Sequence, residues 1–148
     1  MRTLLDPQDL DRLVTRIRRL TPDASARWGR LTAPRMVVHL ADQLRQSLGE
    51  IQVRPRRTVL HWPVIRPLVM YRLPWPRGRI KGSPEIFQTP PSIWSADIAT
   101  LEGLLARFVN EASRGHWPDH PLFGPMTRDD WGRFSYRHFD HHLRQFGV

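Results

Sequence analysis

Apolar residues recur every three or four positions through much of this chain, and this spacing is the feature that most limits what it can fold into. The pattern is clearest from about residue 92 to 113, where apolar residues step by four and three along one helix face. These residues are Trp94, Ile98, Leu101, Leu105 and Phe108. No segment shows the sustained alternation of apolar and polar residues that marks a half-buried strand. The sequence therefore predicts an all-α protein.

Three further helices are predicted from capping residues followed by the same spacing. Asp6, which precedes a proline, is typical of the residue before a helix, and it predicts a first helix over about 7 to 20. Thr32 is placed to cap a second helix in the same way. Thr127 and Asp130 have the spacing of a capping box, which predicts the start of the last helix.

The connection between the second and third long helices is the least regular part of the chain. One or two short helices are expected between 58 and 72, and an irregular loop is expected from 73 to 92, where five prolines and two glycines occur. The aromatic residues of this connection are expected to pack on the helices: Trp62, Trp75 and Phe87. Four helices with one long crossover predict an α-helical bundle. Because either half would be too small to be stable alone, we expect one domain over residues 1 to 148.

The composition restricts the chemistry and the cellular location. The chain has no cysteine, so a transition-metal site would have to use histidine and carboxylate ligands. The N-terminal stretch has acids where a secretory signal would need an apolar run. The most apolar tract, TVLHWPVIRPLVMYRL, is interrupted by charged residues and prolines and is too short to cross a bilayer. We therefore expect a cytoplasmic protein.

A basic block between Arg54 and Lys81 accounts for much of the net charge of +9. It contains eight cations and no acid: Arg54, Arg56, Arg57, Arg66, Arg72, Arg77, Arg79 and Lys81. Such a block can attract phosphate, nucleic acid or an anionic membrane surface. The favoured interpretation of such a run of charges is nevertheless a solvated face without a partner.

The last helix places histidines where its core residues should be. His138 and His142 fall inside its aromatic stripe, one turn apart, so their rings stack on one face and are close enough to bind one ion. The alternative is a pair of core histidines that bond to backbone or water. His141 lies at the edge of the stripe, so we expect it either to contact the ligands from behind or to lie at the surface. Gln145 is placed to orient a ligand or a bound water.

Further ligands would have to come from other segments. His39 flanks the apolar stripe of the second helix, so periodicity alone gives it only modest support as a ligand. Asp42 follows one turn after His39 and is expected on the outer side of the helix. Its expected role is that of a solvated residue or of a hydrogen-bond partner to a histidine. His61, His116 and His120 lie in expected loops, where a surface position is the favoured interpretation. Among these three, His120 is the best placed to approach the end of the bundle.

Three stretches of the sequence together resemble a known family. They are RWGRLTAPRMVVHLADQLRQSLGE, LPWPRGRIKGSPE and HPLFGPMTRDDWGRFSYRHFDHHLRQFGV, and the resemblance runs from about Trp28 to Val148. The family is domain of unknown function 1569, within the DinB/YfiT-like superfamily. The resemblance implies a four-helix bundle, often a homodimer, in which three histidines hold a divalent metal ion. Carried onto this sequence, the ligands are His39, His138 and His142.

The superfamily includes metal-dependent transferases and isomerases that use low-molecular-weight thiols. By resemblance we expect a metal-dependent transferase or hydrolase with a small-molecule or thiol substrate, and zinc or nickel as the metal, with iron and manganese as further candidates. Arg77 or Arg79 would attract an acidic thiol. No residue is assigned as catalytic, because no clear general base is found.

Two alternatives to catalysis remain open. In one, the protein is a non-catalytic module that binds nucleic acid or an anionic membrane surface through the basic block and its aromatic residues. These aromatic residues are Trp62, Tyr71 and Trp75. In the other, a metal ion only stabilises the bundle.

Overall fold

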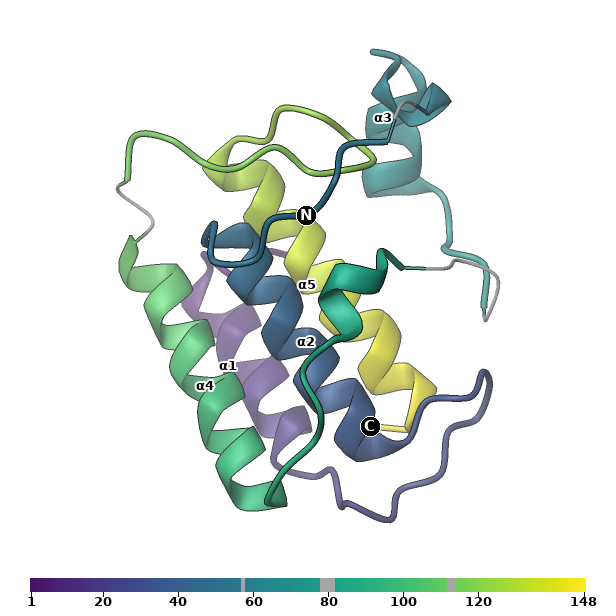
Figure 1. The fold of residues 1–148 in the computed structure, drawn as a ribbon, viewed down its shortest axis with the longest axis vertical. Helices are drawn as coiled ribbons and strands as arrows, with labels where there is room; N and C mark the ends of the chain where they lie inside the picture. The colour runs from purple at the N-terminus through teal and green to yellow at the C-terminus, as the bar shows by residue number, and fades with distance from the viewer. Residues whose placement is uncertain (57, 78–81, 112–113) are drawn as a thin grey trace.

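The fold is built from four long helices and several short helical turns (Figure 1). The computed structural model describes residues 1–56, 58–77, 82–111 and 114–148. The long helices are α1 (Pro7–Ile17), α2 (Ala33–Ser47), α4 (Trp94–Asn110) and α5 (Arg128–Gln145). The short turns are η1 (Val59–His61), α3 (Ile65–Pro67), η2 (Leu68–Arg72) and η3 (Pro84–Phe87). Within the described ranges there is no strand, so the predicted all-α class is confirmed.

The predicted caps begin three of the four long helices. The Asp6 carboxylate accepts hydrogen bonds from two backbone N–H groups at the start of α1, and the Thr32 hydroxyl accepts one at the start of α2. Thr127 and Asp130 form the predicted capping box of α5. These bonds satisfy donors that a helix leaves free at its N-terminus, which explains why the helices begin there.

Two helix ends differ from the prediction. The first helix ends at Ile17 instead of reaching residue 20, because the last turn tightens: the Leu20 N–H donates to the Ile17 carbonyl, three residues back. The α4 helix ends at Asn110. Residues 112 and 113, to which that helix was predicted to extend, lie outside the described residues.

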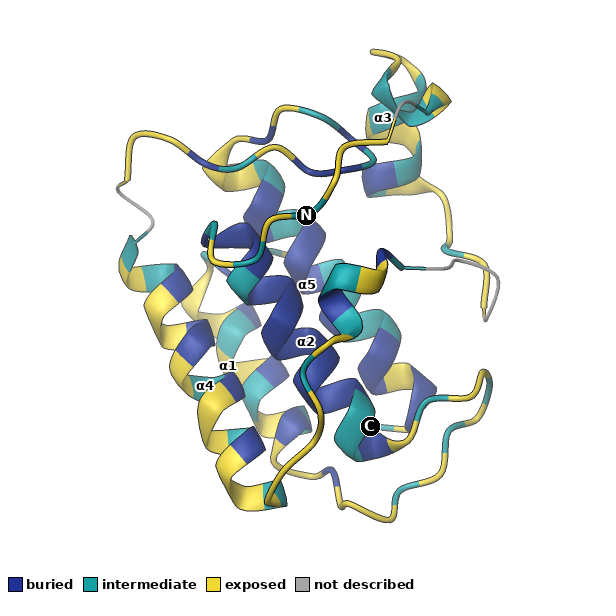
Figure 2. Cartoon of the chain, in the orientation of Figure 1, coloured by how far each residue is buried: buried dark blue, intermediate teal, exposed yellow. Residues whose placement is uncertain are grey.

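Helix α2 lies at the centre of the fold. It packs against α4, α5 and η3, and most of its surface is buried (Figure 2). The prediction that Asp42 lies on the outer side of this helix is wrong, because Asp42 is 0% exposed. The segment after η3 covers that side, and Asp42 accepts hydrogen bonds from the Thr89 hydroxyl at 2.7 Å and from Arg45 at 2.8 Å.

The long crossover is more regular than predicted, since η3 forms a helical turn within it. This turn packs on α2, and Arg35 donates a hydrogen bond of 2.6 Å to the carbonyl of Thr89 just beyond it. Trp75 and Phe87 pack inward as predicted. Trp62 does not, because it is 63% exposed.

One cluster of buried apolar side chains connects the four long helices. Its largest fully buried members include Leu13, Leu44, Phe108, Trp131 and Phe139. Because each long helix contributes to this cluster, burial of apolar surface holds the helices together. Among the described residues, no helix combines the length and apolar character needed to cross a membrane.

Candidate metal centre

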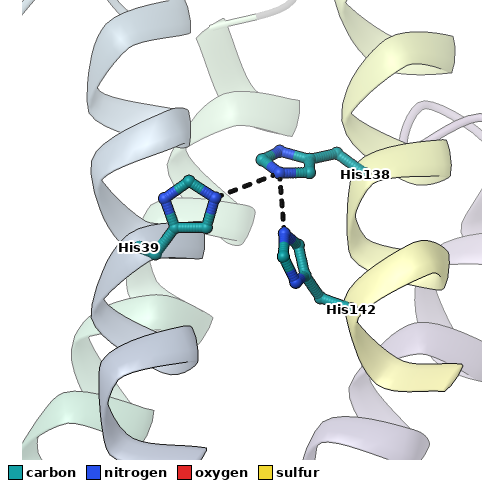
Figure 3. A group of neighbouring side chains, drawn as sticks. All are labelled: His39, His138 and His142. Carbon is teal, nitrogen blue, oxygen red and sulfur yellow. Dashed lines mark hydrogen bonds between the residues drawn. The ribbon is translucent and has the colours of Figure 1, made fainter. Parts of the chain in front are cut away.

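Three histidine rings from two antiparallel helices converge on one point (Figure 3). His39 comes from the middle of α2, while His138 and His142 come from successive turns of α5. The Nε2 atom of His138 lies 3.1 Å from the Nε2 atom of His39 and 3.1 Å from that of His142. One ligand atom from each residue lies within 4.8 Å of the others, a spacing that a single ion can bridge.

The backbone of η3 fixes the hydrogen on His39. The Nδ1 atom of His39 lies 3.0 Å from the carbonyl oxygen of Ile86. Because a carbonyl oxygen only accepts hydrogen bonds, Nδ1 carries the hydrogen and the Nε2 atom of a neutral ring has a free lone pair. That lone pair is directed at His138. Phe87 stacks on the same ring with centroids 4.0 Å apart, which holds its orientation.

Gln145 fixes His142 in the same tautomer. The Nδ1 atom of His142 lies 2.8 Å from the Oε1 atom of Gln145. The amide nitrogen of Gln145 donates to the Trp28 carbonyl at 2.6 Å, which sets the orientation of the amide. His142 Nδ1 therefore carries the hydrogen, and its Nε2 lone pair also faces His138. Gln145, predicted to orient a ligand or a water, contacts this histidine.

A neutral His138 ring cannot donate a hydrogen bond to both of the Nε2 lone pairs that face it, those of His39 and His142. Its Nε2 atom faces the Nε2 atoms of His39 and His142, while its Nδ1 atom is buried without a hydrogen-bond partner among the described residues. If His138 carries its hydrogen on Nε2, it can donate to only one of these lone pairs, and its Nδ1 atom remains without a hydrogen-bond partner in the described part of the chain. A hydrogen on Nδ1 would leave three lone pairs facing one another. A cation among the three Nε2 atoms would remove the repulsion between their lone pairs, so the three facing donors fit a metal ion.

Burial keeps the three rings neutral. Desolvation lowers the pKa of His39 to about 4, and desolvation followed by repulsion from His39 lowers that of His142 to about 3. The pKa of His138 is lowered well below its ordinary value by desolvation and then by the charges that His142 and His39 would carry. Neutral imidazole is the form that binds metal ions, so protons compete weakly at neutral pH.

His141 lies beside the cluster and is not part of it. It is partly exposed, and its ring packs edge-on to His142 at 5.3 Å and to Trp28 at 5.9 Å. Desolvation lowers its pKa. Asp42 is also separate from the three nitrogens, since its carboxylate contacts Thr89 and Arg45.

Of the three histidines predicted to lie in surface loops, His120 differs most from its predicted position, because it is only 6% exposed. A tight turn to Gly124 folds it inward, where its ring packs on Phe134 with centroids 4.6 Å apart. The His120 Nδ1 atom accepts a hydrogen bond from the N–H of Leu122 at 3.1 Å, so the hydrogen lies on Nε2. Burial, followed by the positive charge of Arg66, lowers its pKa to about 3.

The cluster forms part of the wall of a cavity of about 870 Å³. This volume lies in the range of small-molecule sites. Sequence patterns did not identify Ile86, which fixes His39 through a backbone carbonyl, or Trp28 and Gln46, which also line the cavity. Ile86 acts through its backbone carbonyl, a group that every residue has, so its side chain gives no signal in the sequence.

The basic block is partly neutralised by an acid from another helix. Arg66 pairs with Asp130 of α5 at 3.1 Å. Arg54, Arg56 and Arg72 are exposed, and the guanidinium of Arg77 lies 4.7 Å above the ring of Trp28. Three cations of the block, Arg57, Arg79 and Lys81, lie outside the described residues.

A comparison with protein families gives one match over nearly the whole chain. Residues 1–147 match the model of a family described as "Protein of unknown function (DUF1569)". No curated protein and no solved structure matches significantly.

Proposed function

The chain belongs to the DUF1569 family, whose description assigns no function, and we propose that it binds a divalent metal ion through His39, His138 and His142. The observation that carries this proposal is the pair of fixed tautomers. Ile86 and Gln145 hold the Nδ1 hydrogens of His39 and His142, which directs two lone pairs at the Nε2 atom of His138. Metal-binding histidines usually donate their other N–H group in this way.

The donor set favours a transition metal. Three neutral imidazoles suit zinc or nickel best, and iron or manganese are further candidates, whereas magnesium and calcium prefer oxygen ligands. The ligand group found among the described residues contains no carboxylate. Three protein ligands leave a coordination position for a small molecule, which is the arrangement of a catalytic site.

The resemblance to the DinB/YfiT-like superfamily supports the same assignment. We propose that α1, α2, α4 and α5 form its four-helix bundle, with one ligand from the second long helix and two from the last. The homodimer that the resemblance implies belongs to this proposal. Support comes from the positions of His39 on α2 and of the histidine pair on α5.

We propose that the reaction is a transfer or a hydrolysis that involves a small-molecule or thiol substrate. A divalent ion, when bound, lowers the pKa of a coordinated water or thiol toward neutrality. The chain itself orients two ligands through Ile86 and Gln145, and it places Trp75 and Phe87 where they shield the rings from water. Asp42, the nearest carboxylate in the sequence to His39, is committed to Thr89 and Arg45 and is therefore not a general base.

A basic binding module is the less favoured function, because two of its three aromatic residues have other contacts. Tyr71 donates a hydrogen bond to Asp130, and Trp75 packs near His138 and His141. Base stacking requires aromatic faces that are free to receive a base. Trp62 alone of the three is largely exposed.

Metal analysis of the purified protein tests the proposal. We expect about one ion per chain, and we expect it to be lost in the double variant His138→Ala and His142→Ala. His116→Ala is the matched control, because His116 is exposed and lies outside the cluster. It should retain the ion. Equal traces of metal in the wild type and the double variant would refute the proposal.

A further inference from the structure

The cavity extends along the groove between α2 and α5, on both sides of the three histidines. Its α5 wall runs from Phe134 to Gln145, which at the helical rise is on the order of 16 Å. Its α2 wall includes His39 and Gln46, about 10 Å apart. The cavity is therefore longer than the space that metal ligation requires.

One end of the cavity is apolar. Phe134 lies 5.9 Å from Phe123, and the neighbouring wall is completed by aliphatic side chains. These are Leu60, Val69 and Leu122. Gln46 and His120 are the polar side chains at this end, and both are neutral, since burial lowers the pKa of His120 to about 3. A sugar or peptide would leave most of its polar groups without partners here, which costs free energy.

The other end carries positive charge. Arg30 lines the cavity next to Trp28 and Gly29, and Arg77 lies over the ring of Trp28 at 4.7 Å. Both arginines are exposed, and neither has an ion-pair partner in the part of the chain that the structure describes. The described lining residues include no aspartate or glutamate. An anionic group is therefore favoured at this end.

We propose that the cavity binds a hydrophobic organic anion, with its apolar body toward Phe123 and Phe134 and its charge toward Arg30 and Arg77. The proposal rests on the proposed function, because it names the substrate class of that same site. The apolar body gains free energy from the surface it buries, and the anion gains from two arginines that have no carboxylate partner among the described residues.

Two fluorescent probes that differ by one charged group test the polar end. Anilinonaphthalene sulfonate and N-phenylnaphthylamine share the same aromatic body, and only the first is an anion. Removing Arg30 and Arg77 together (R30A/R77A) should weaken sulfonate binding by about fivefold and leave the neutral probe within about twofold. Arg12→Ala is the control, because Arg12 is an exposed arginine on α1, a helix that contributes no residue to the described cavity wall.

A substitution in the apolar wall tests the other end. Leu122→Ser should weaken both probes by about fivefold, because both lose the same apolar contact. Leu68→Ser is the matched control, since Leu68 is 44% exposed and does not line the cavity. Circular dichroism on every variant checks that the fold is retained.

The outcomes separate this inference from the metal proposal. Absence of saturable binding of either probe, or an equal effect of R30A/R77A on both probes, would overturn the inference even where one ion per chain is found. Saturable binding that depends on these arginines, in protein that holds no ion even without chelator and takes up none when a divalent metal is added, would support the ligand class and refute the metal site. Each titration is therefore run with and without a chelator, beside metal analysis of the same sample.

Discussion

His142 can direct a lone pair at the cluster only while its Nδ1 hydrogen stays with Gln145. The amide nitrogen of Gln145 donates to the carbonyl of Trp28, which fixes the other end of the amide. The next residue, Gly29, must lack a side chain, because a Cβ atom there would lie 2.7 Å from that nitrogen. Gly29 also has a φ of +79°, which other residues rarely adopt. The turn at Gly29 is thus part of the support for His142.

Replacing Gln145 with leucine should weaken metal binding by about 10- to 100-fold, because His142 loses the acceptor that selects its tautomer. Gln145→Glu keeps an acceptor oxygen, so it should lose less affinity. Competition with a chromophoric chelator measures both constants. Wild-type affinity in Gln145→Leu would show that the Nδ1 bond has no part in ligation.

Outside the three-histidine cluster, His120 also makes the stability of the metal-free protein depend on pH. Its pKa is about 3 in the folded state, against 6.5 as the ordinary value, so between these values the unfolded chain binds the extra proton. The free energy of unfolding therefore falls as the pH falls from about 6.5 toward 3. The ionisation of His120 contributes no penalty above about pH 7, where the ring is neutral in both states.

His120→Gln should remove this contribution. Over pH 4 to 6 the slope of the unfolding free energy should become shallower by about 1.4 kcal/mol per pH unit, the value for one proton. Urea unfolding of chelator-treated wild type and variant at several pH values measures the slopes. His116→Gln, at an exposed loop position, is the control and should keep the wild-type slope. Identical slopes in His120→Gln and the wild type would mean that His120 takes up its proton in the folded state as well.

At the scale of elements, η3 connects the crossover to α2 through several independent contacts. Thr89 donates to Asp42, Arg35 donates to the carbonyl of Thr89, and His39 donates to the carbonyl of Ile86. The middle of α2 is therefore covered by a segment that also sets the orientation of one ligand. Loosening this segment should affect stability and metal binding together.

Asp42→Ala should lower the free energy of unfolding by about 2–3 kcal/mol, because it leaves the Thr89 hydroxyl and Arg45 without their acceptor. Glu111→Ala removes a partly exposed acid paired with Arg107 and should cost less than about 1 kcal/mol. Denaturant unfolding compares the two. Hydrogen exchange at Ile86 should become faster in Asp42→Ala alone; equal stability of the two variants would contradict the buried role of Asp42.

The elements that the sequence predicted well are those with local causes. Asp6, Thr32 and Thr127 cap helices through bonds to the next few residues, so their effect can be read from spacing. His120 and Asp42 were misplaced because their burial depends on segments distant in sequence. The histidine pair on α5 followed from helical spacing, whereas His39 as its third member followed from the family resemblance, since its position beside an apolar stripe left the matter open.

At the scale of the whole molecule, an ion held by His39, His138 and His142 would join α2 to α5, the two helices that flank the cavity. The unfolded chain does not hold these residues together, so binding favours the folded state. At a free metal concentration 100 times the dissociation constant, the gain is about 2.7 kcal/mol. For a chain of this length that corresponds to a shift of roughly 5–10 °C in melting temperature.

Chelation should therefore lower the melting temperature of the wild type by roughly 5–10 °C, and re-addition of the metal should restore it. The double variant H138A/H142A should melt at the same temperature with and without chelator, because it has lost two of the three ligands. Scanning calorimetry at fixed pH measures the shift. A chelator effect of equal size in the variant would place the ion elsewhere in the molecule, and the cluster would then be a set of buried histidines whose facing lone pairs need another explanation.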